Sequence, residues 1–222
     1  MTRWVLLVVA LGVLSHARAD GMACGDGGIG PTVLVVGDSL SAGYGIDLEE
    51  GWVALLESKL AAHYADARVI NASISGDTTS GGRTRLKKAL ATHRPSLVII
   101  ELGGNDGLRG LSLRAMRRNL TDMVESSRAA GAEVALLGIR IPPNYGTRYA
   151  DSFHTIYTDL ASRYEAPMVD FFLEGVALND DLMQADGIHP NAQAQPRLLD
   201  NAWPAVVAGL DAWCARAPAP TP

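Results

Sequence analysis

The sequence predicts one α/β domain in which a parallel β-sheet is covered by helices on both faces. Short apolar, β-branched segments alternate along the chain with longer segments of helical periodicity, an order typical of parallel sheets. The strand segments are apolar at successive positions rather than at every second one, as expected for strands buried on both faces. The chain has 222 residues, of which 48% are hydrophobic and 19% charged, so it is long enough for one domain with its own core.

The individual elements follow from local patterns. Strands are expected at residues 32–36, 68–71, 97–102, 133–139 and 167–169. Helices are expected around residues 52–60, 113–124 and 149–164, the first two because apolar residues recur three and four positions apart. A further helix with basic side chains should end near His93, before Pro95. A terminal helix is expected from about residue 191 to 213, and Pro204 inside it predicts a kink or a break into two pieces.

The N-terminus has the layout of a secretory signal peptide. Arg3 precedes an apolar run at residues 4–14, and residues 17–19 form a small-x-small site, so cleavage is expected before Asp20. The run is too short to span a bilayer, which takes about 20 residues; an uncleaved anchor is the alternative. We therefore expect a signal peptide at 1–19, a domain at 20–216, a disordered Pro/Ala-rich tail at 217–222, and a periplasmic or secreted protein without a stable membrane anchor.

Charge and cysteine content exclude several classes of protein. Without residues 1–19 the chain carries 17 basic and 24 acidic residues, whereas nucleic-acid-binding proteins usually carry a basic surplus. Two cysteines are too few for a disulfide scaffold. Cys24 precedes the first strand and Cys214 ends the last helix. Because the ends of compact domains are often close together, a Cys24–Cys214 disulfide is expected in an oxidising compartment, with two free thiols as the alternative.

Polar residues and glycines gather directly after the predicted strands. Residues 37–41 (GDSLS) follow the first strand, 73–77 (SISGD) the second and 103–106 (GGND) the third, while 186–190 (DGIHP) precede the last helix. Parallel sheets place their active sites at the carboxyl ends of strands. We therefore expect these four segments to meet at one edge of the sheet.

The residue types in these segments fit acyl transfer through a serine nucleophile. The Ser39 hydroxyl needs an adjacent base, and an imidazole such as His189 can take and return a proton near neutral pH. Asp186 is expected to accept the other imidazole N–H and so fix the tautomer. The backbone N–H groups of Ser39 and Gly76 and the side-chain amide of Asn105 are expected to form the oxyanion hole.

Several of these residues also have a simpler interpretation. Ser39 could only cap the helix that follows it, the commonest role of a serine after a strand. Asp186 and His189 could belong to a metal site, but no further ligands lie at metal-binding spacing, and no metal is expected. Asp38 and Asp106 are expected to be structural, accepting hydrogen bonds from loop backbone.

The ordered segments resemble the GDSL or SGNH hydrolase family, whose blocks hold a serine, a glycine, an asparagine and a histidine, matched here by Ser39, Gly76, Asn105 and His189. Within that family they are similar to the group of periplasmic acyl-CoA thioesterase I, lysophospholipase and arylesterase, in residues 37–44, 71–78, 101–110, 139–146 and 186–191. The resemblance extends from about Thr32 to the last helix. It implies a flavodoxin-like three-layer fold with a five-stranded parallel sheet, no cofactor, and hydrolysis of aryl esters, acyl thioesters and lysophospholipids.

Two loops indicate where an acyl chain would bind. Residues 107–111 follow the Asn105 segment, and residues 141–145 follow the fourth strand. Leu108, Leu111, Ile141 and Tyr145 are expected to line an acyl groove, with the first loop moving to cover the chain; ordinary loop packing is the alternative.

The predicted function is that of a serine esterase that acts on a small-molecule acyl ester or thioester, including lysophospholipids. A carbohydrate O-acetyl esterase uses the same residues on short acetyl groups and is one alternative. A non-catalytic periplasmic lipid-binding protein is the other, but it would not need a complete set of catalytic groups.

Overall fold

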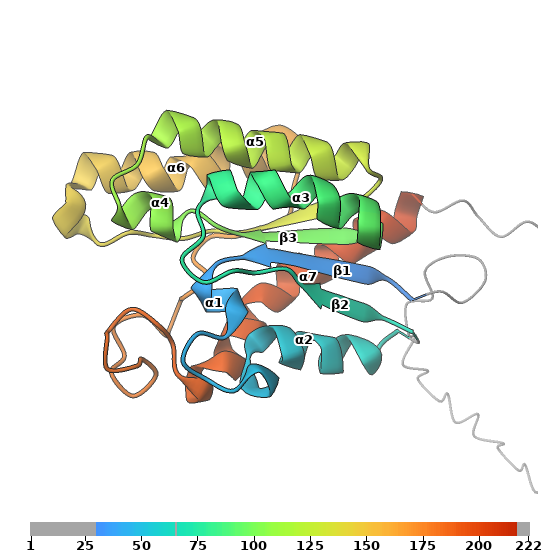
Figure 1. The fold of residues 1–222 in the computed structure, drawn as a ribbon, viewed down its shortest axis with the longest axis horizontal. Helices are drawn as coiled ribbons and strands as arrows, with labels where there is room; N and C mark the ends of the chain where they lie inside the picture. Colours follow the sequence, from blue (N-terminus) through green and yellow to red (C-terminus); the bar gives the residue numbers. More distant parts are fainter. Residues whose placement is uncertain (1–29, 65, 217–222) are drawn as a thin grey trace, which may run out of the picture.

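A parallel sheet of five strands forms the centre of the molecule, with the strand order β2-β1-β3-β4-β5 (Figure 1). The computed structural model describes residues 30–64 and 66–216. Its strands are β1 (Thr32–Gly37), β2 (Arg68–Asn71), β3 (Leu97–Glu101), β4 (Glu133–Leu137) and β5 (Met168–Val169). The predicted fold class and all five predicted strands are confirmed, with shifts of one or two residues at their ends.

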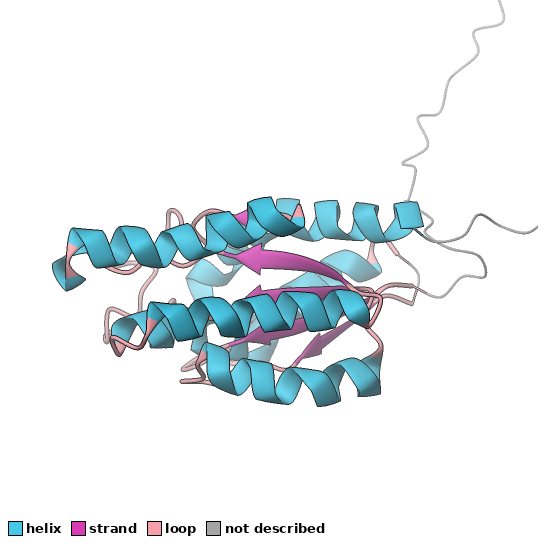
Figure 2. Ribbon diagram, turned by 90° about the horizontal axis from the view of Figure 1, so that it is seen from above, coloured by secondary structure: helices cyan, strands magenta, loops and turns pink. Residues whose placement is uncertain are grey.

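Helices cover both faces of this sheet and make it a three-layer structure (Figures 1 and 2). One face carries α3 (Thr79–His93), α4 (Gly104–Leu108), α5 (Leu113–Ala129) and α6 (Thr147–Tyr164). The other face carries α2 (Trp52–Ala61) and α7 (Gln195–Arg216), with the four-residue α1 (Ser39–Ala42) beside β1. Single 3₁₀ turns lie at Leu48–Glu50, Pro143–Tyr145 and Ala192–Ala194. Within the described residues, no helix has both the length and the apolar character that crossing a membrane requires.

Burial on both faces explains why the central strands are apolar throughout. Every residue of β1, β3 and β4 is buried, because helices lie above and below them. Each fully buried Val, Leu or Ile side chain contributes about 1.5–3 kcal/mol to the hydrophobic driving force. On the α2–α7 side, Trp52 is fully buried and meets the ring of Phe172 edge-on at 5.3 Å between centroids.

The strand order creates a crevice at the carboxyl end of the sheet. From β1 the chain crosses to β2 on one side and then returns to β3 on the other side of β1. The connections that leave β1 and β3 therefore diverge, and such a switch point is where open α/β sheets bind their ligands. Ser39 directly follows β1, and Asn105 directly follows β3, so this topology brings both residues to that point.

The structure differs from the sequence-based predictions in α7 and in α4. α7 continues through Pro204 as one helix, so of the predicted kink or break the break is wrong and the kink stays a prediction; Pro204 is exposed, where a missing backbone hydrogen bond is replaced most easily by water. Gly107 and Leu108 belong to α4 rather than to a loop.

Cys24, the predicted signal peptide at 1–19 and the tail at 217–222 lie outside the described residues. The start of β1 and the end of α7 lie at the same end of the molecule (Figure 1), but the Cys24–Cys214 disulfide stays a prediction.

Candidate active site

Ser39 lies at the sharp turn between β1 and α1. Asp38 is the N-cap of α1, and its Oδ1 accepts a hydrogen bond from the backbone N–H of Leu40 at 3.1 Å. Ser39 is therefore the first residue of the helix and not its cap, so the capping interpretation of Ser39 is wrong. The short helix ends at Gly43, whose left-handed conformation (φ 71°) lets the chain turn away after one turn. The Ser39 hydroxyl is left at the carboxyl end of the sheet without a capping role.

His189 and Asp186 come to Ser39 from the segment before α7. The Nε2 atom of His189 lies 2.9 Å from Ser39 Oγ, and its Nδ1 atom lies 2.6 Å from Asp186 Oδ2. The other oxygen of Asp186, Oδ1, accepts the backbone N–H groups of Ile188 and His189 at 2.9 and 3.0 Å. The hydrogen bond from the His189 side chain, helped by these two backbone bonds, lowers the pKa of Asp186 to about 2. Asp186 is thus a charged acceptor for Nδ1–H, which leaves Nε2 to accept the Ser39 proton.

The three donors predicted for the oxyanion hole lie on the turn after β1 and on the segments that follow β2 and β3. The Asn105 side chain donates one amide hydrogen to Asp38 Oδ2 at 3.0 Å, and the second amide hydrogen remains available. Within the described residues, the backbone N–H groups of Ser39 and Gly76 donate to no protein acceptor. Gly76 has φ 77°, a conformation that residues with a Cβ rarely adopt. One side chain, Arg109, reaches both Gly76 O at 3.0 Å and Asn105 Oδ1 at 3.4 Å, so Gly76 and Asn105 lie side by side.

Buried carboxyl groups lie directly behind these donors. Asp38 is only 2% exposed, and this burial raises its pKa to about 6 despite the hydrogen bonds from Leu40 and Asn105. Glu101, at the end of β3, is completely buried; burial, together with the nearby Asp38 carboxylate, holds its pKa well above the usual range. The Oε2 atom of Glu101 accepts hydrogen bonds from Ser41 Oγ at 2.7 Å and from Asp38 N at 3.3 Å. Through these two bonds Glu101 supports the turn on which Ser39 lies.

Asp106 has the structural role that the sequence predicts, although its main partner is a helix rather than a loop. Its two carboxylate oxygens accept the backbone N–H and the hydroxyl of Thr79, at 2.8 and 2.6 Å. Thr79 begins α3, so Asp106 ties α4 to the first turn of α3. This bond holds the Asn105 segment against the segment that contains Gly76.

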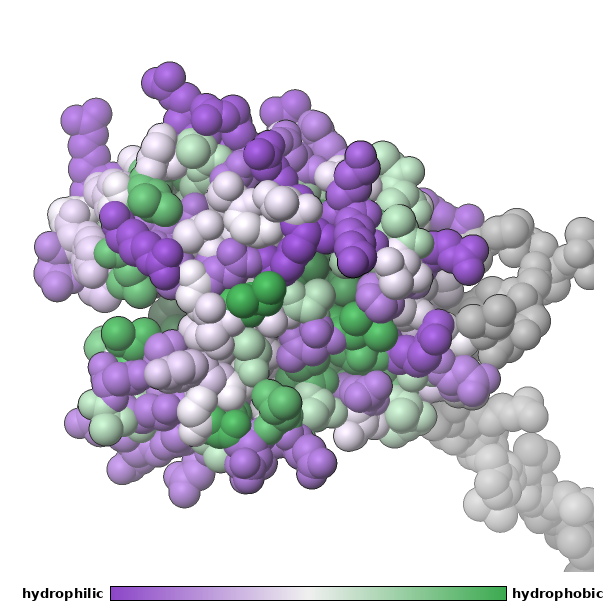
Figure 3. All heavy atoms as spheres, viewed as in Figure 1, coloured by the Kyte–Doolittle hydropathy of each residue, from purple (hydrophilic) through white to green (hydrophobic). Residues whose placement is uncertain are grey.

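The proposed acyl-groove residues lie on two neighbouring segments. Leu108, Leu111 and Tyr145 are exposed, whereas Ile141 is buried. A Cβ atom added to Gly107 would lie 2.7 Å from Ile141 Cγ2, so Ile141 packs directly against the backbone of α4. In Figure 3, apolar and polar side chains alternate around a hollow at the left end of the molecule, where the carboxyl ends of the strands lie.

Comparison with known proteins agrees with this geometry. The model of the GDSL-like Lipase/Acylhydrolase family matches residues 35–196, a region that contains Ser39, Gly76, Asn105, Asp186 and His189. The chain belongs to this family.

Members with similar sequences include several named hydrolases. Esterase TesA of Pseudomonas aeruginosa is 56% identical over 173 residues, which are 78% of this chain and 86% of that protein. Arylesterase of Vibrio mimicus is 48% identical over 168 residues (76% and 84%), and thioesterase 1/protease 1/lysophospholipase L1 of Escherichia coli K12 is 46% identical over 169 residues (76% and 80%). A crystal structure of TesA aligns with a TM-score of 0.76 at 55% identity and covers 79% of this chain and 97% of that one.

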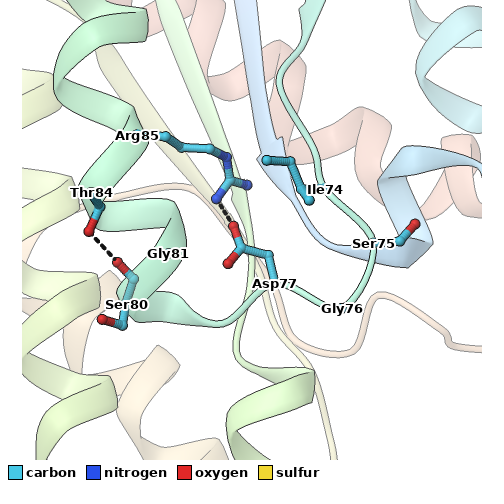
Figure 4. Close-up of a pocket in the computed structure, with 8 residues that line it drawn as sticks. All are labelled: Ile74, Ser75, Gly76, Asp77, Ser80, Gly81, Thr84 and Arg85. Atoms are coloured by element: carbon cyan, nitrogen blue, oxygen red, sulfur yellow. Dashed lines mark hydrogen bonds and ion pairs between the residues drawn. The ribbon is translucent and has the colours of Figure 1, made fainter.

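This GDSL-like hydrolase also has a surface cavity of about 460 Å³ next to Gly76 (Figure 4). The loop from Ile74 to Asp77 and the first turns of α3 line it, and none of the four proposed acyl-groove residues is among its lining residues. At its inner wall the Arg85 guanidinium pairs with Asp77 and donates to Gly37 O at 2.9 Å and to Ala72 O at 3.0 Å. Arg85 therefore ties the ends of β1 and β2 together below the site.

Sequence reasoning missed four residues that support the site in this family member. Arg109 and Glu101 lie in a segment that carries the family resemblance, but the sequence pattern assigns neither of them a role in the site. A glutamate within an otherwise apolar strand was a usable signal for Glu101, because a carboxyl group is rarely buried without a partner. Tyr44, whose ring lies 4.4 Å from the His189 ring, also lies in such a segment, whereas Gln184, which bonds to the backbone of Tyr44 and Pro190, gave no local signal.

Proposed function

We propose that the chain is a serine hydrolase that cleaves carboxylic esters and thioesters through an acyl-enzyme. The observation that carries this proposal is the hydrogen-bonded series from Ser39 Oγ to His189 Nε2 at 2.9 Å and from His189 Nδ1 to Asp186 at 2.6 Å. A serine hydroxyl is a weak nucleophile unless a base lies within hydrogen-bonding distance, and that base must be oriented by a third group. Both conditions are met here.

Acylation begins when the Ser39 oxygen attacks the acyl carbonyl carbon and His189 Nε2 takes the hydroxyl proton. The resulting imidazolium is stabilised by Asp186, which remains charged because its pKa is lowered to about 2 by its bond to His189. When the tetrahedral intermediate collapses, the bond to the leaving oxygen or sulfur breaks, and His189 gives the proton to that atom. A water molecule, deprotonated by the same imidazole, then attacks the acyl-Ser39 ester. The bond between the acyl carbon and Ser39 Oγ breaks, His189 returns the proton to Oγ, and the acid is released.

The oxyanion of each tetrahedral intermediate is assigned to three donors, namely the N–H groups of Ser39 and Gly76 and the free amide hydrogen of Asn105. Asp38 and Arg109 support this assignment, because they hold the two ends of the Asn105 amide at 3.0 and 3.4 Å. Donors that are fixed before the charge develops need no reorganisation, which makes them effective in the transition state.

The substrates are small-molecule acyl esters and thioesters, which we propose to include aryl esters and lysophospholipids. The names of the relatives as arylesterase and thioesterase/lysophospholipase support this range. The acyl chain is assigned to a groove between α4 and the segment after β4, with Ile141 as its floor and Leu108, Leu111 and Tyr145 at its rim. The contact between Ile141 and the Gly107 backbone supports this assignment, because it brings the two segments together.

We also propose that the protein works outside the cytoplasm, as a domain of residues 20–216 released by cleavage before Asp20. The charged, apolar and small-residue regions of residues 1–19 support this. The physiological ester would then be one that is present in the periplasm or in the medium.

Hydrolysis of p-nitrophenyl esters from acetyl to palmitoyl tests the proposal, with Ser39→Ala and the matched control Ser75→Ala, an exposed serine near Gly76. We expect turnover on medium or long chains that falls about 10⁴–10⁶-fold in Ser39→Ala and persists in Ser75→Ala. Activity confined to acetyl esters would instead indicate a carbohydrate esterase. If no ester gave Ser39-dependent turnover, the enzymatic proposal would be overturned in favour of a lipid-binding protein.

A further inference from the structure

The aromatic ring of Tyr44 lies directly against the catalytic imidazole. Its centroid is 4.4 Å from that of His189, and the two ring planes are inclined by 39°. The Tyr44 side chain is 52% exposed and is not part of the hydrophobic core. Within the described residues, the Tyr44 hydroxyl has no hydrogen-bond partner. The ring is thus presented to solvent on one side and to His189 on the other.

Gln184 fixes this ring relative to His189 through the backbone. Its side-chain amide donates to Tyr44 O at 2.7 Å and to Pro190 O at 3.0 Å, and its backbone N–H donates to His189 O at 2.7 Å. The turn after α1 and the segment that carries the base are therefore joined through one residue. A surface held in this way is pre-organised, so binding to it costs little conformational entropy.

The reaction itself determines which part of the substrate lies here. His189 Nε2 must protonate the leaving oxygen or sulfur, so that atom lies within hydrogen-bonding distance of Nε2. Its substituent must then extend along the surface beside the imidazole. The acyl carbonyl oxygen is assigned to the proposed oxyanion donors, which belong to other segments, at Gly76 and Asn105. Beside the imidazole, the exposed apolar side chains are Tyr44 and the neighbouring Ile188, which is 51% exposed.

We infer that Tyr44 and Ile188 form a leaving-group subsite that favours flat aromatic alcohols and thiols. The inference rests on the proposed function and adds to it a site for the leaving group, made of residues other than those of the proposed acyl groove. The Tyr44 ring offers an aromatic face on which an aryl leaving group can stack, while a methyl or ethyl group gains little from that contact. Selection by this subsite acts on acylation only, because the leaving group has gone before deacylation.

Two butyrate esters that differ only in the leaving group test this subsite. The value of kcat/KM is measured for phenyl butyrate and methyl butyrate, and the ratio of the two is compared between variants. We expect Tyr44→Ala to lower the phenyl-to-methyl ratio roughly 2- to 10-fold and Tyr44→Phe, which retains the ring, to leave it unchanged. Ile188→Ala should lower the ratio by a smaller factor. Tyr145→Ala, an exposed tyrosine on the acyl side, should change both kcat/KM values by the same factor, since the acyl group is shared.

An equal loss of kcat/KM for both esters in Tyr44→Ala would mean that the ring only positions His189, and kcat/KM values equal to those of wild type for both esters would mean that it contacts no substrate; either result overturns the subsite. If Tyr44→Ala does not fold, Ile188→Ala provides the same comparison from an exposed position, and an unchanged ratio there overturns the subsite. Turnover that survives Ser39→Ala would instead overturn the proposed function, so the two failures can be told apart.

Discussion

Replacing Asp38 with asparagine should make the protein more stable at high pH and much less active. Asp38 is 2% exposed, and its carboxylate accepts hydrogen bonds from Leu40 N at 3.1 Å and Asn105 Nδ2 at 3.0 Å. Asparagine has nearly the same shape and can still accept from Leu40. It would, however, turn an amide NH₂ group toward the NH₂ group of Asn105, and it carries no charge.

The stability effect follows from the pKa of Asp38, which burial raises from 3.8 to about 6. This rise corresponds to about 3 kcal/mol less stability when Asp38 is ionised in the folded state. Because the native protein holds this proton to a higher pH than the unfolded chain does, the contribution of Asp38 to stability is lost as the pH rises through about 6. The free energy of unfolding of Asp38→Asn should therefore increase relative to that of wild type by about 2 kcal/mol between pH 4.5 and pH 8, which makes the variant relatively more stable at the higher pH.

The activity effect follows from the conflict with Asn105. If the Asn105 amide rotates or shifts, one oxyanion donor is lost, and kcat should fall by up to about 10²–10³-fold with little change in KM. Urea denaturation at both pH values and hydrolysis of p-nitrophenyl butyrate at pH 8 measure the two effects. Asp47→Asn, at an exposed aspartate without a side-chain capping bond, is the matched control. A kcat within a factor of about three of wild type, or a stability difference that does not vary with pH, would refute this reasoning.

Four further outcomes are expected. Asn105→Ala should lower kcat by about 10²–10³-fold at nearly constant KM in steady-state assays; a change in KM alone would assign Asn105 to binding. Phe172→Ala should destabilise the fold by about 3–5 kcal/mol in urea denaturation, because Phe172 is fully buried against Trp52; a loss under about 1 kcal/mol would contradict that packing. Ile141→Ser should change the chain-length profile on p-nitrophenyl esters, and an unchanged profile would remove Ile141 from the acyl groove. Thiol titration of the native, mature protein should detect no reactive thiol. Two reactive thiols per chain would exclude the Cys24–Cys214 disulfide.

Apolar patterns predicted the strands and the layers of this fold, whereas the short helix α4 was not predicted. β1, β3 and β4 are recognisable because burial on both faces demands apolar residues throughout. α4 contains two glycines in five residues, and nothing in its composition favours a helix. It is held instead by distant contacts, such as the bonds from Thr79 to Asp106. Contacts between residues that are distant in the chain produce no pattern in the local sequence, so they could not be predicted from it.

The same division applies to the candidate site. Ser39, Asp186 and His189 could be selected because few residue types perform their chemistry, and the sheet topology predicts where they meet. Residues that only hold the others in place have no such constraint. Gln184 acts through bonds to the backbone of Tyr44, 140 positions away, and a glutamine at that distance looks like any surface glutamine.

The nucleophile and its base are 150 positions apart in the chain. A chain that is delivered to its compartment from the N-terminus presents the serine early and the histidine almost last. Until the segment around residue 189 docks beside α1, the serine is an ordinary alcohol, and a chain truncated before that segment remains inert. Hydrolysis by the proposed mechanism therefore requires this docking, and the recovery of activity during refolding would report when the last segment reaches α1.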